Sequence, residues 1–317
     1  MSERVCVAGH RGMLGQALVR HLVASGVKPW CPADDLRSIP DAEAAFAGQD
    51  VVFLAAGVGG GIAKNLRVPA DLARDTLRLL TGTLEGARRA GVSRFVWFGC
   101  ACLYPVLDHP ATEADLWGGS LEPSSRAFAA AQLAGVELTR AYHAQYGLQG
   151  LCVVCPTLYG PGDDFSPDGH VVASLMRRFH EARREGLPQV EVWGTGAARR
   201  QMLYVDDLAE AAIKIAGSAW FPTVIPLVNV AGEGAVTVAG LAGEVARAVG
   251  YEGKIRAGSG PEGARAKELA SSVPALFTPT PLDVGLRRTY EWFLANAAHL
   301  PGRADSVSVQ RVAKENP

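Results

Sequence analysis

Short, uninterrupted apolar runs alternate with longer segments of helical periodicity in the first half of the chain. The apolar runs cover residues 5–8, 51–54, 94–98 and 151–155. Apolar positions 14, 18, 22 and 23 recur at helical spacing after the first run, and the ranges 69–90 and 127–146 also predict helices. Strands that are apolar throughout are buried on both faces, so this alternation predicts an α/β protein with a parallel sheet covered by helices on both sides.

The pattern is looser after Pro156. Proline, glycine and aspartate crowd residues 160–169 and predict a loop. A helix over 170–184, a strand over 190–193, a helix from 206 and a helix over 286–298 follow, with shorter elements between 217 and 300. Residues 301–317 are polar and lack periodicity, so we expect a disordered tail.

Composition narrows the class of protein. The chain has 317 residues, enough for about two domains, and 31 basic against 32 acidic residues give a net charge of -1 without any basic run. This balance argues against a nucleic-acid partner. No apolar stretch reaches the roughly 18 residues of a membrane span. The first residues lead directly into a strand, so we expect no signal peptide. Six cysteines are too few for a disulfide scaffold. We therefore expect a cytoplasmic protein.

A glycine-rich turn joins the first strand to the first helix. Gly9, Gly12 and Gly15 are spaced GxxGxxG at this junction. Glycines here allow a tight turn, close approach of a pyrophosphate and close helix–sheet packing, while the helix N-terminus offers unpaired N–H groups to an anion. The turn predicts a dinucleotide site; the alternative is a glycine-rich turn that binds nothing.

Two cysteine pairs raise the question of a metal site. Cys100 and Cys102 flank one residue, and Cys152 and Cys155 flank two. On a strand, Cys152 and Cys155 point to opposite faces, which does not suit a shared tetrahedral site. We therefore expect no metal.

The chain resembles the extended short-chain dehydrogenase/reductase family, and within it the GDP-L-fucose synthases, which are 3,5-epimerase/4-reductases of GDP-sugar metabolism. The motifs that carry the resemblance are VAGHRGMLG at 7–15, LAAGVGGGI at 54–62, LEP at 121–123, AG at 134–135, QYG at 145–147, LYGP at 158–161, RRFHE at 177–181, WGTG at 193–196, VDD at 205–207 and YEWFL at 290–294.

This resemblance implies a Rossmann domain, a smaller C-terminal α/β substrate-binding lobe and a homodimer. We expect the Rossmann domain over 1–160, with the range 188–232 returning to it, and the substrate lobe mainly over 161–300. The resemblance implies NADP as cofactor, with NAD as the alternative because Asp34 or Asp35 suits a ribose hydroxyl and no arginine follows the second strand before Arg37. The implied cofactor-binding residues are Gly9, Arg11, Gly12, Met13, Leu14, Gly15, Ala55 and Ala56.

Reductases of this family carry a serine, a tyrosine and a lysine, of which the tyrosine donates a proton as hydride arrives. The corresponding positions here are Cys100, Phe128 and Gln132. Phenylalanine has no ionisable proton and glutamine has no charge, so we expect no C4 reduction. Tyr104 or Tyr159 could replace the missing phenol from another direction.

The epimerase half of the family chemistry uses a cysteine and a histidine, which correspond to Cys102 and His170. Inversion beside a ketone needs one group to remove a proton and another to return one, and a thiol and an imidazole titrate near neutrality. The alternatives are an inert buried thiol at Cys102 and a helix cap at His170.

The resemblance also implies that Arg178, Trp193, Arg200 and Lys267 contact the substrate, the basic side chains suiting a diphosphate. Arg178 could instead be a solvated helix residue, and the asparagine expected between Thr157 and Leu158 is missing. We expect an epimerase of a nucleotide-linked, GDP-type 4-keto sugar. The alternatives are a non-catalytic nucleotide-sugar-binding homologue and an NADPH-dependent 4-keto sugar reductase with an atypical proton donor.

Overall fold

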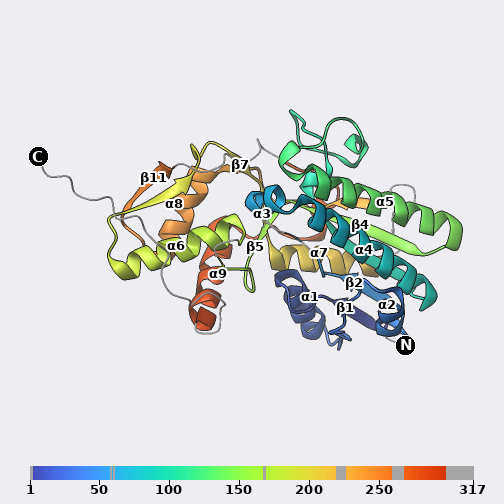
Figure 1. The fold of residues 1–317 in the computed structure, drawn as a ribbon. Coiled ribbons are helices and arrows are strands. Elements are labelled where there is room, and N and C mark those ends of the chain that lie inside the picture. Colours follow the sequence, from blue (N-terminus) through green and yellow to red (C-terminus); the bar gives the residue numbers. More distant parts are fainter. Residues whose placement is uncertain are drawn as a thin grey trace, which may run out of the picture.

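The computed structural model describes residues 3–57, 59, 61–166, 169–218, 226–258 and 268–297, apart from the side chains of Ile62 and Ala63. Its larger lobe is built on a central parallel sheet, and a smaller lobe lies beside one end of that sheet (Figure 1). The expected disordered tail at 301–317 lies outside the described residues.

Among the described residues, five parallel strands make the central sheet in the order β1-β2-β3-β4-β9. Their bounds are β1 Val5–Ala8, β2 Val51–Leu54, β3 Arg94–Cys100, β4 Gln149–Cys155 and β9 Leu227–Asn229. On the outer side of β1, Trp30 adds an isolated parallel bridge to Cys6. Each of β1, β2 and β9 is buried along its whole length, as expected for strands with helices on both faces.

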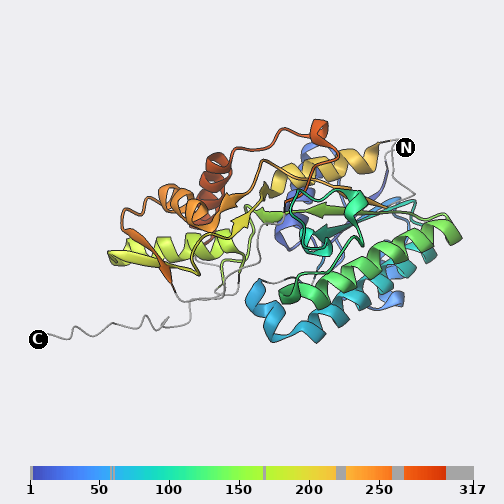
Figure 2. The same ribbon diagram turned by 90° about the horizontal axis from the view of Figure 1, so that it is seen from above.

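Helices cover both faces of this sheet. One layer contains α2 (Ile39–Phe46), α4 (Pro69–Arg89) and α5 (Arg126–Tyr146), and the other contains α1 (Met13–Ala24) and α7 (Val205–Gly217) (Figure 2). The short α3 (Ile62–Arg67) precedes α4. The doubly wound, Rossmann-type α/β fold expected from the sequence is thus confirmed.

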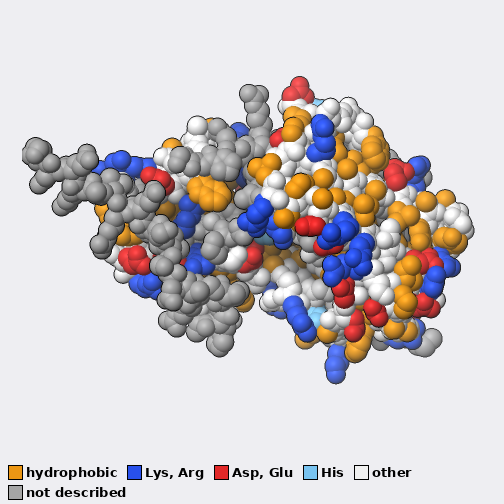
Figure 3. All heavy atoms as spheres, viewed as in Figure 1, with side chains coloured by type: hydrophobic (Ala, Val, Ile, Leu, Met, Phe, Trp, Pro, Cys, Tyr) orange, Lys and Arg blue, Asp and Glu red, His pale blue; other side chains and the backbone are white. Residues whose placement is uncertain are grey.

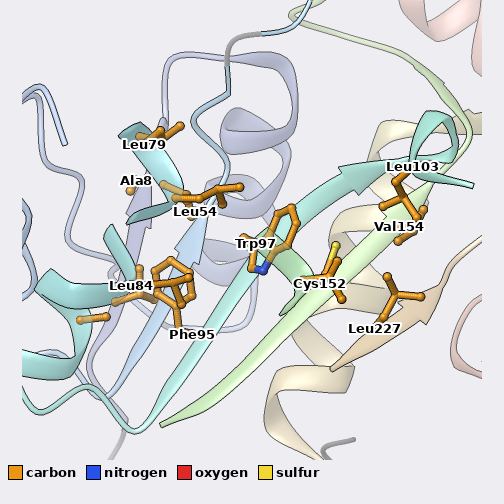
Figure 4. Close-up of a cluster of buried hydrophobic side chains, with 14 of the residues drawn as sticks. Ala8, Leu54, Leu79, Leu84, Phe95, Trp97, Leu103, Cys152, Val154 and Leu227 are labelled. Atoms are coloured by element: carbon orange, nitrogen blue, oxygen red, sulfur yellow. The ribbon is translucent and has the colours of Figure 1, made fainter. Parts of the chain in front are cut away.

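Successive side chains of each strand point alternately toward the two helix layers. Trp97 and Cys152 are neighbours in register on β3 and β4, and both face the α4–α5 layer (Figure 4). Cys155, three residues further along β4, belongs to the cluster on the opposite face. The expectation that Cys152 and Cys155 point to opposite faces is therefore confirmed. Among the described residues, no group of three or more His, Cys, Asp or Glu side chains could hold a metal ion.

The smaller lobe packs helices α6 (Val171–Glu185), α8 (Val238–Val249) and α9 (Leu282–Asn296) around its own apolar cluster. Two-stranded sheets accompany them: β6 (Gln189–Trp193) pairs with β11 (Lys254–Gly258), β5 (Thr157–Tyr159) with β8 (Met202–Tyr204), and β7 (Arg199–Arg200) with β10 (Val236–Thr237). Phe179, Leu241 and Leu286 are buried where the helices meet.

The range 188–232, which the sequence assigns to the Rossmann domain, is divided between the lobes. Strand β9 pairs with β4 in the central sheet, and helix α7 packs on one face of that sheet. Strand β6 instead pairs with β11 of the smaller lobe. The domain boundaries stay a prediction. No helix in the described part of the chain is both long and apolar enough to cross a membrane. On the face shown in Figure 3, basic and acidic side chains are interspersed.

Candidate active site

The turn after β1 is too tight for any side chain at its first glycine. Gly9 has a φ of 90°, and a Cβ there would lie 2.2 Å from the backbone nitrogen of Ala56. A Cβ on Gly15 would lie 2.1 Å from the carbonyl oxygen of Gly9. The turn therefore presses against the end of β2 on one side and the first turn of α1 on the other, as the spacing of these glycines requires.

A cavity of about 430 Å³ opens beside this turn. It is lined by Gly9, His10, Arg11, Gly12, Pro32, Ala33, Asp34, Asp35, Leu36, Arg37, Ala55, Ala56, Gly57, Asp75 and Leu79. Five of the eight residues expected to bind the cofactor are in this wall: Gly9, Arg11, Gly12, Ala55 and Ala56. Leu14 packs into the core below α1 and Met13 against it. Any contact of Met13, Leu14 or Gly15 with a dinucleotide through its backbone stays a prediction.

The residues around the cavity fit a dinucleotide. Helix α1 begins after Gly12 without a side-chain cap and without an acidic residue in its first turn, so its N–H groups face the turn uncompensated. The Nδ1 atom of His10 is buried in the same turn, and it has no hydrogen-bond partner within the described ranges. An anion such as a pyrophosphate satisfies an exposed helix N-terminus of this kind.

Charged side chains of both signs stand at the far end of the cavity. Arg37 forms an ion pair with Asp35 at 2.5 Å and lies 3.6 Å from Asp75. The hydrogen bond from Arg37 lowers the pKa of Asp35 to about 2. A phosphate on the ribose would therefore have to compete with Asp35 for Arg37.

Two cysteines lie where β3 ends and a short 3₁₀ turn (Ala101–Leu103) begins. The side chain of Gln132, on α5, reaches this segment and is only 6% exposed. Its Oε1 atom accepts a hydrogen bond from the Cys100 N–H at 3.1 Å and one from the Cys102 thiol at 3.8 Å. The structure thus brings Cys100, Cys102 and Gln132 together, and Cys102 is partly exposed rather than fully buried.

His170 stands directly before α6 and makes no capping hydrogen bond with its side chain. Instead, its Nδ1 atom lies 3.0 Å from Oδ1 of Asp163, whose side chain is 2% exposed, whereas the imidazole is 46% exposed. The hydrogen bond to Asp163 raises the pKa of His170, and Asp164 and Cys100 act in the same direction. Cys100 is thus within electrostatic range of the imidazole.

The loop that carries Asp163 lies against helix α1. Gly162 has a φ of 86°, and a Cβ there would lie 3.1 Å from the side-chain amide of Gln16. Gln16 in turn donates a hydrogen bond from Nε2 to the carbonyl oxygen of Arg11 at 2.8 Å. The Gln16 side chain therefore lies between the glycine turn and the loop that leads to His170.

Arg178 and Arg200, two of the basic residues assigned to the substrate, lie in the smaller lobe. The guanidinium carbon of Arg178 lies 6.0 Å from the ring centre of Trp193, and Arg178 donates to the carbonyl oxygen of Glu191 at 2.8 Å. Burial lowers the pKa of Arg178 and of Arg200, and Glu122 acts on Arg200 in the opposite direction. Arg178 is therefore not a freely solvated helix residue. Lys267 lies outside the described residues.

Comparison with known proteins agrees with this arrangement. The model of the NAD dependent epimerase/dehydratase family matches residues 5–221. The chain belongs to this family. It is 36% identical to GDP-L-fucose synthase of Escherichia coli, over 95% of this chain and 99% of that protein, and 37% identical to GDP-L-fucose synthase 1 of Arabidopsis thaliana, over 94% and 95%. The structure of GDP-mannoheptose C4 reductase of Campylobacter jejuni, with NADP bound, matches with a TM-score of 0.83 and 26% identity over 92% of this chain and 98% of that one.

Neither Tyr104 nor Tyr159, the two tyrosines considered as substitute proton donors, is accessible to a substrate. Tyr104 is 1% exposed and donates to Oδ1 of Asn229 at 2.7 Å. Tyr159 is equally buried and packs against Tyr204. Burial raises the pKa of both phenols. The idea that one of them replaces the missing phenol therefore loses its support.

Several residues of the site were not among those singled out in the sequence. They are His10, Asp75 and Asp163. The hydrogen bonds between Gln132 and the cysteine segment were also not predicted. His10 lies inside the glycine motif and could have been included on that ground. Asp163 and Asp75 carry no local signal, because each acquires its role from a residue brought close by the fold.

Proposed function

We propose that this chain is an epimerase of a GDP-linked 4-keto sugar, inverting C3, C5 or both without reducing C4. The similarity to GDP-L-fucose synthases over nearly the whole of both chains supports the substrate class. The observation that carries the proposal is the side chain of Gln132, which stands where the resemblance expects a lysine and bonds to the cysteine segment. This position supplies no cation for hydride transfer.

Inversion begins with removal of a proton next to the ketone. The ketone at C4 makes the protons on C3 and C5 acidic, and the thiolate of Cys102 removes one of them. The C–H electron pair moves into an enolate whose oxygen is O4. His170 returns a proton from the opposite face, and the two groups exchange roles when a centre needs the reverse order. An imidazole whose pKa is raised keeps its proton to higher pH, which supports the acid role.

The enolate oxygen needs a hydrogen-bond donor. Phe128, where the resemblance expects the tyrosine, offers none. The candidates for this donor are Cys100, a backbone N–H of the cysteine segment and a water molecule. Cys100 also contributes to the raised pKa of His170.

The binding residues divide between the lobes. Arg178 and Arg200 neutralise the nucleotide diphosphate, and Trp193, which is 55% exposed, offers an apolar ring face. Gly9, Gly12 and the N-terminus of α1 hold the pyrophosphate of a dinucleotide, NADP being supported by the relative with NADP bound. When bound, this group supplies hydride in reductases, and we propose that here it is structural.

The decisive experiment is proton exchange. The protein is incubated with a GDP-4-keto-6-deoxy sugar in D₂O, and deuterium at C3 and C5 is followed by NMR spectroscopy. We expect exchange in the wild type and its loss when Cys102→Ser and His170→Asn are combined. Absence of exchange, or exchange that survives the double substitution, refutes the proposal. A ligand-dependent rise in melting temperature without exchange would favour the non-catalytic binding homologue.

Reduction at C4 is the second candidate, because the relative from Campylobacter jejuni is a C4 reductase. NADPH oxidation measured at 340 nm in the presence of the same 4-keto sugar separates the two. We expect none above the rate without sugar, and Phe128→Tyr combined with Gln132→Lys serves as the comparison that restores the expected donor and cation.

A further inference from the structure

The carboxylate of Asp163 is buried beside the imidazole of His170 in an unusual state of hydrogen bonding. Its Oδ1 atom accepts from His170 Nδ1 at 3.0 Å and from the backbone N–H of Asp164 at 2.8 Å. Its Oδ2 atom is buried and has no hydrogen-bond partner within the part of the chain that the structure describes. A buried carboxylate oxygen without a hydrogen-bond partner lowers the stability of the fold. The burial of Asp163 therefore calls for an explanation other than stability.

We propose that Asp163 is the positioning residue of the epimerase: its carboxylate fixes His170 with the proton on Nδ1 and leaves Nε2 to meet the sugar. This inference rests on the proposed function. Because a carboxylate only accepts, the ring nitrogen that faces it carries a proton. A ring held through Nδ1 exchanges its catalytic proton at Nε2, and the His170 side chain is 46% exposed.

The arrangement is not explained as a helix cap. His170 precedes α6, yet its side chain makes no hydrogen bond to the helix N-terminus. Gly162, directly before Asp163, has a φ of 86°, a backbone conformation that glycine adopts without steric cost, and it lies beside the side chain of Gln16. The side chain of Asp163 is 2% exposed and its Oδ1 atom lies 3.0 Å from the Nδ1 atom of His170.

The charge of Asp163 also sets the protonation of the acid. Asp163, Asp164 and Cys100 each raise the pKa of His170, whereas burial lowers it. Raising the pKa retains the imidazolium to higher pH. Removing the charge of Asp163 leaves burial less opposed, so the acid form is then lost at lower pH.

Two variants separate contact from charge. Asp163→Asn keeps the shape and an oxygen acceptor but removes the charge. Asp164→Asn removes an equal charge one residue away, and its backbone N–H still donates to Asp163. We expect Asp163→Asn to slow C3 or C5 exchange by about tenfold or more at neutral pH and to move the alkaline limb of the pH profile to lower pH. Asp164→Asn should stay within about twofold.

Histidine titration followed by NMR spectroscopy provides a readout independent of turnover, with His170→Asn used to assign the signal. We expect the pKa of His170 to fall in Asp163→Asn by more than in Asp164→Asn. An equal fall in both variants, or none, overturns the inference. If the wild type shows no exchange, the proposed function fails, while this titration still judges the pairing of Asp163 with His170.

Should Asp163→Asn fail to fold, the wild type alone decides. Long-range ¹H–¹⁵N spectra distinguish the two neutral tautomers of histidine. We expect neutral His170 to carry its proton on Nδ1. A proton on Nε2 in the wild type refutes the positioning role.

Discussion

Replacing Gln132 with methionine tests whether the amide holds the cysteine segment in place. Methionine has nearly the same length and is apolar, so the Cys100 N–H loses the acceptor that now lies 3.1 Å away. A neutral hydrogen bond at a site only 6% exposed contributes about 1 kcal/mol. The contact to the Cys102 thiol, at 3.8 Å, adds less because S–H is a weak donor. We therefore expect Gln132→Met to lower the free energy of unfolding by about 1–2 kcal/mol.

Urea unfolding at constant pH measures this change. Gln145→Met is the matched control, because it makes the same replacement at an exposed position of the same helix and should stay within about 0.5 kcal/mol of wild type. Gln132→Lys should destabilise more than Gln132→Met, since it buries a cation that cannot accept from either cysteine. An unchanged urea midpoint for Gln132→Met would refute the reasoning, as would a Gln132→Lys protein as stable as the wild type.

Three further changes test other parts of the structure. Tyr104→Phe removes a buried hydroxyl that donates at 2.7 Å, so it should cost about 1–2 kcal/mol in a urea melt and leave C3/C5 exchange unchanged; slower exchange would return Tyr104 to the chemistry. Asp35→Asn removes the closer acidic partner of Arg37, leaving Asp75, and should tighten NADPH relative to NADH by about two- to fivefold in fluorescence titration; an unchanged ratio would show that Arg37 does not meet the 2′-phosphate. The hydrogen bond from Arg88 lowers the pKa of Glu85 from 4.5 to about 2, so its stabilisation is present above pH 4.5 and lost as pH falls towards 2. Glu85→Gln should therefore be less stable than wild type at pH 7 in thermal melts, with the difference vanishing near pH 2.

The central strands could be predicted because each is a continuous apolar run. β1 and β2 match the expected bounds, whereas β3 continues through Gly99 to Cys100, beyond its apolar residues. β9 was missed because three residues give too short a signal, although they add the fifth strand. Helix α8 was missed because Gly240 and Gly243 interrupt its apolar periodicity.

The site divides in the same way. The glycine turn could be predicted since its chemistry lies within seven consecutive residues. The pairing of Gln132 with Cys102 could not, because it joins α5 to the end of β3 only after both have packed. The pairing of Asp163 with His170 depends on the left-handed backbone at Gly162, which the sequence leaves open among many glycines.

The Gln16 amide has a mechanical consequence. One end of this side chain is anchored on the glycine turn, and its flank supports the loop that leads into Asp163. If a dinucleotide binds at this turn, as we propose, we expect it to restrict the motion of the loop that leads to Asp163 and His170. Under the proposed function, a bound dinucleotide would thus help to hold His170 in position without transferring hydride.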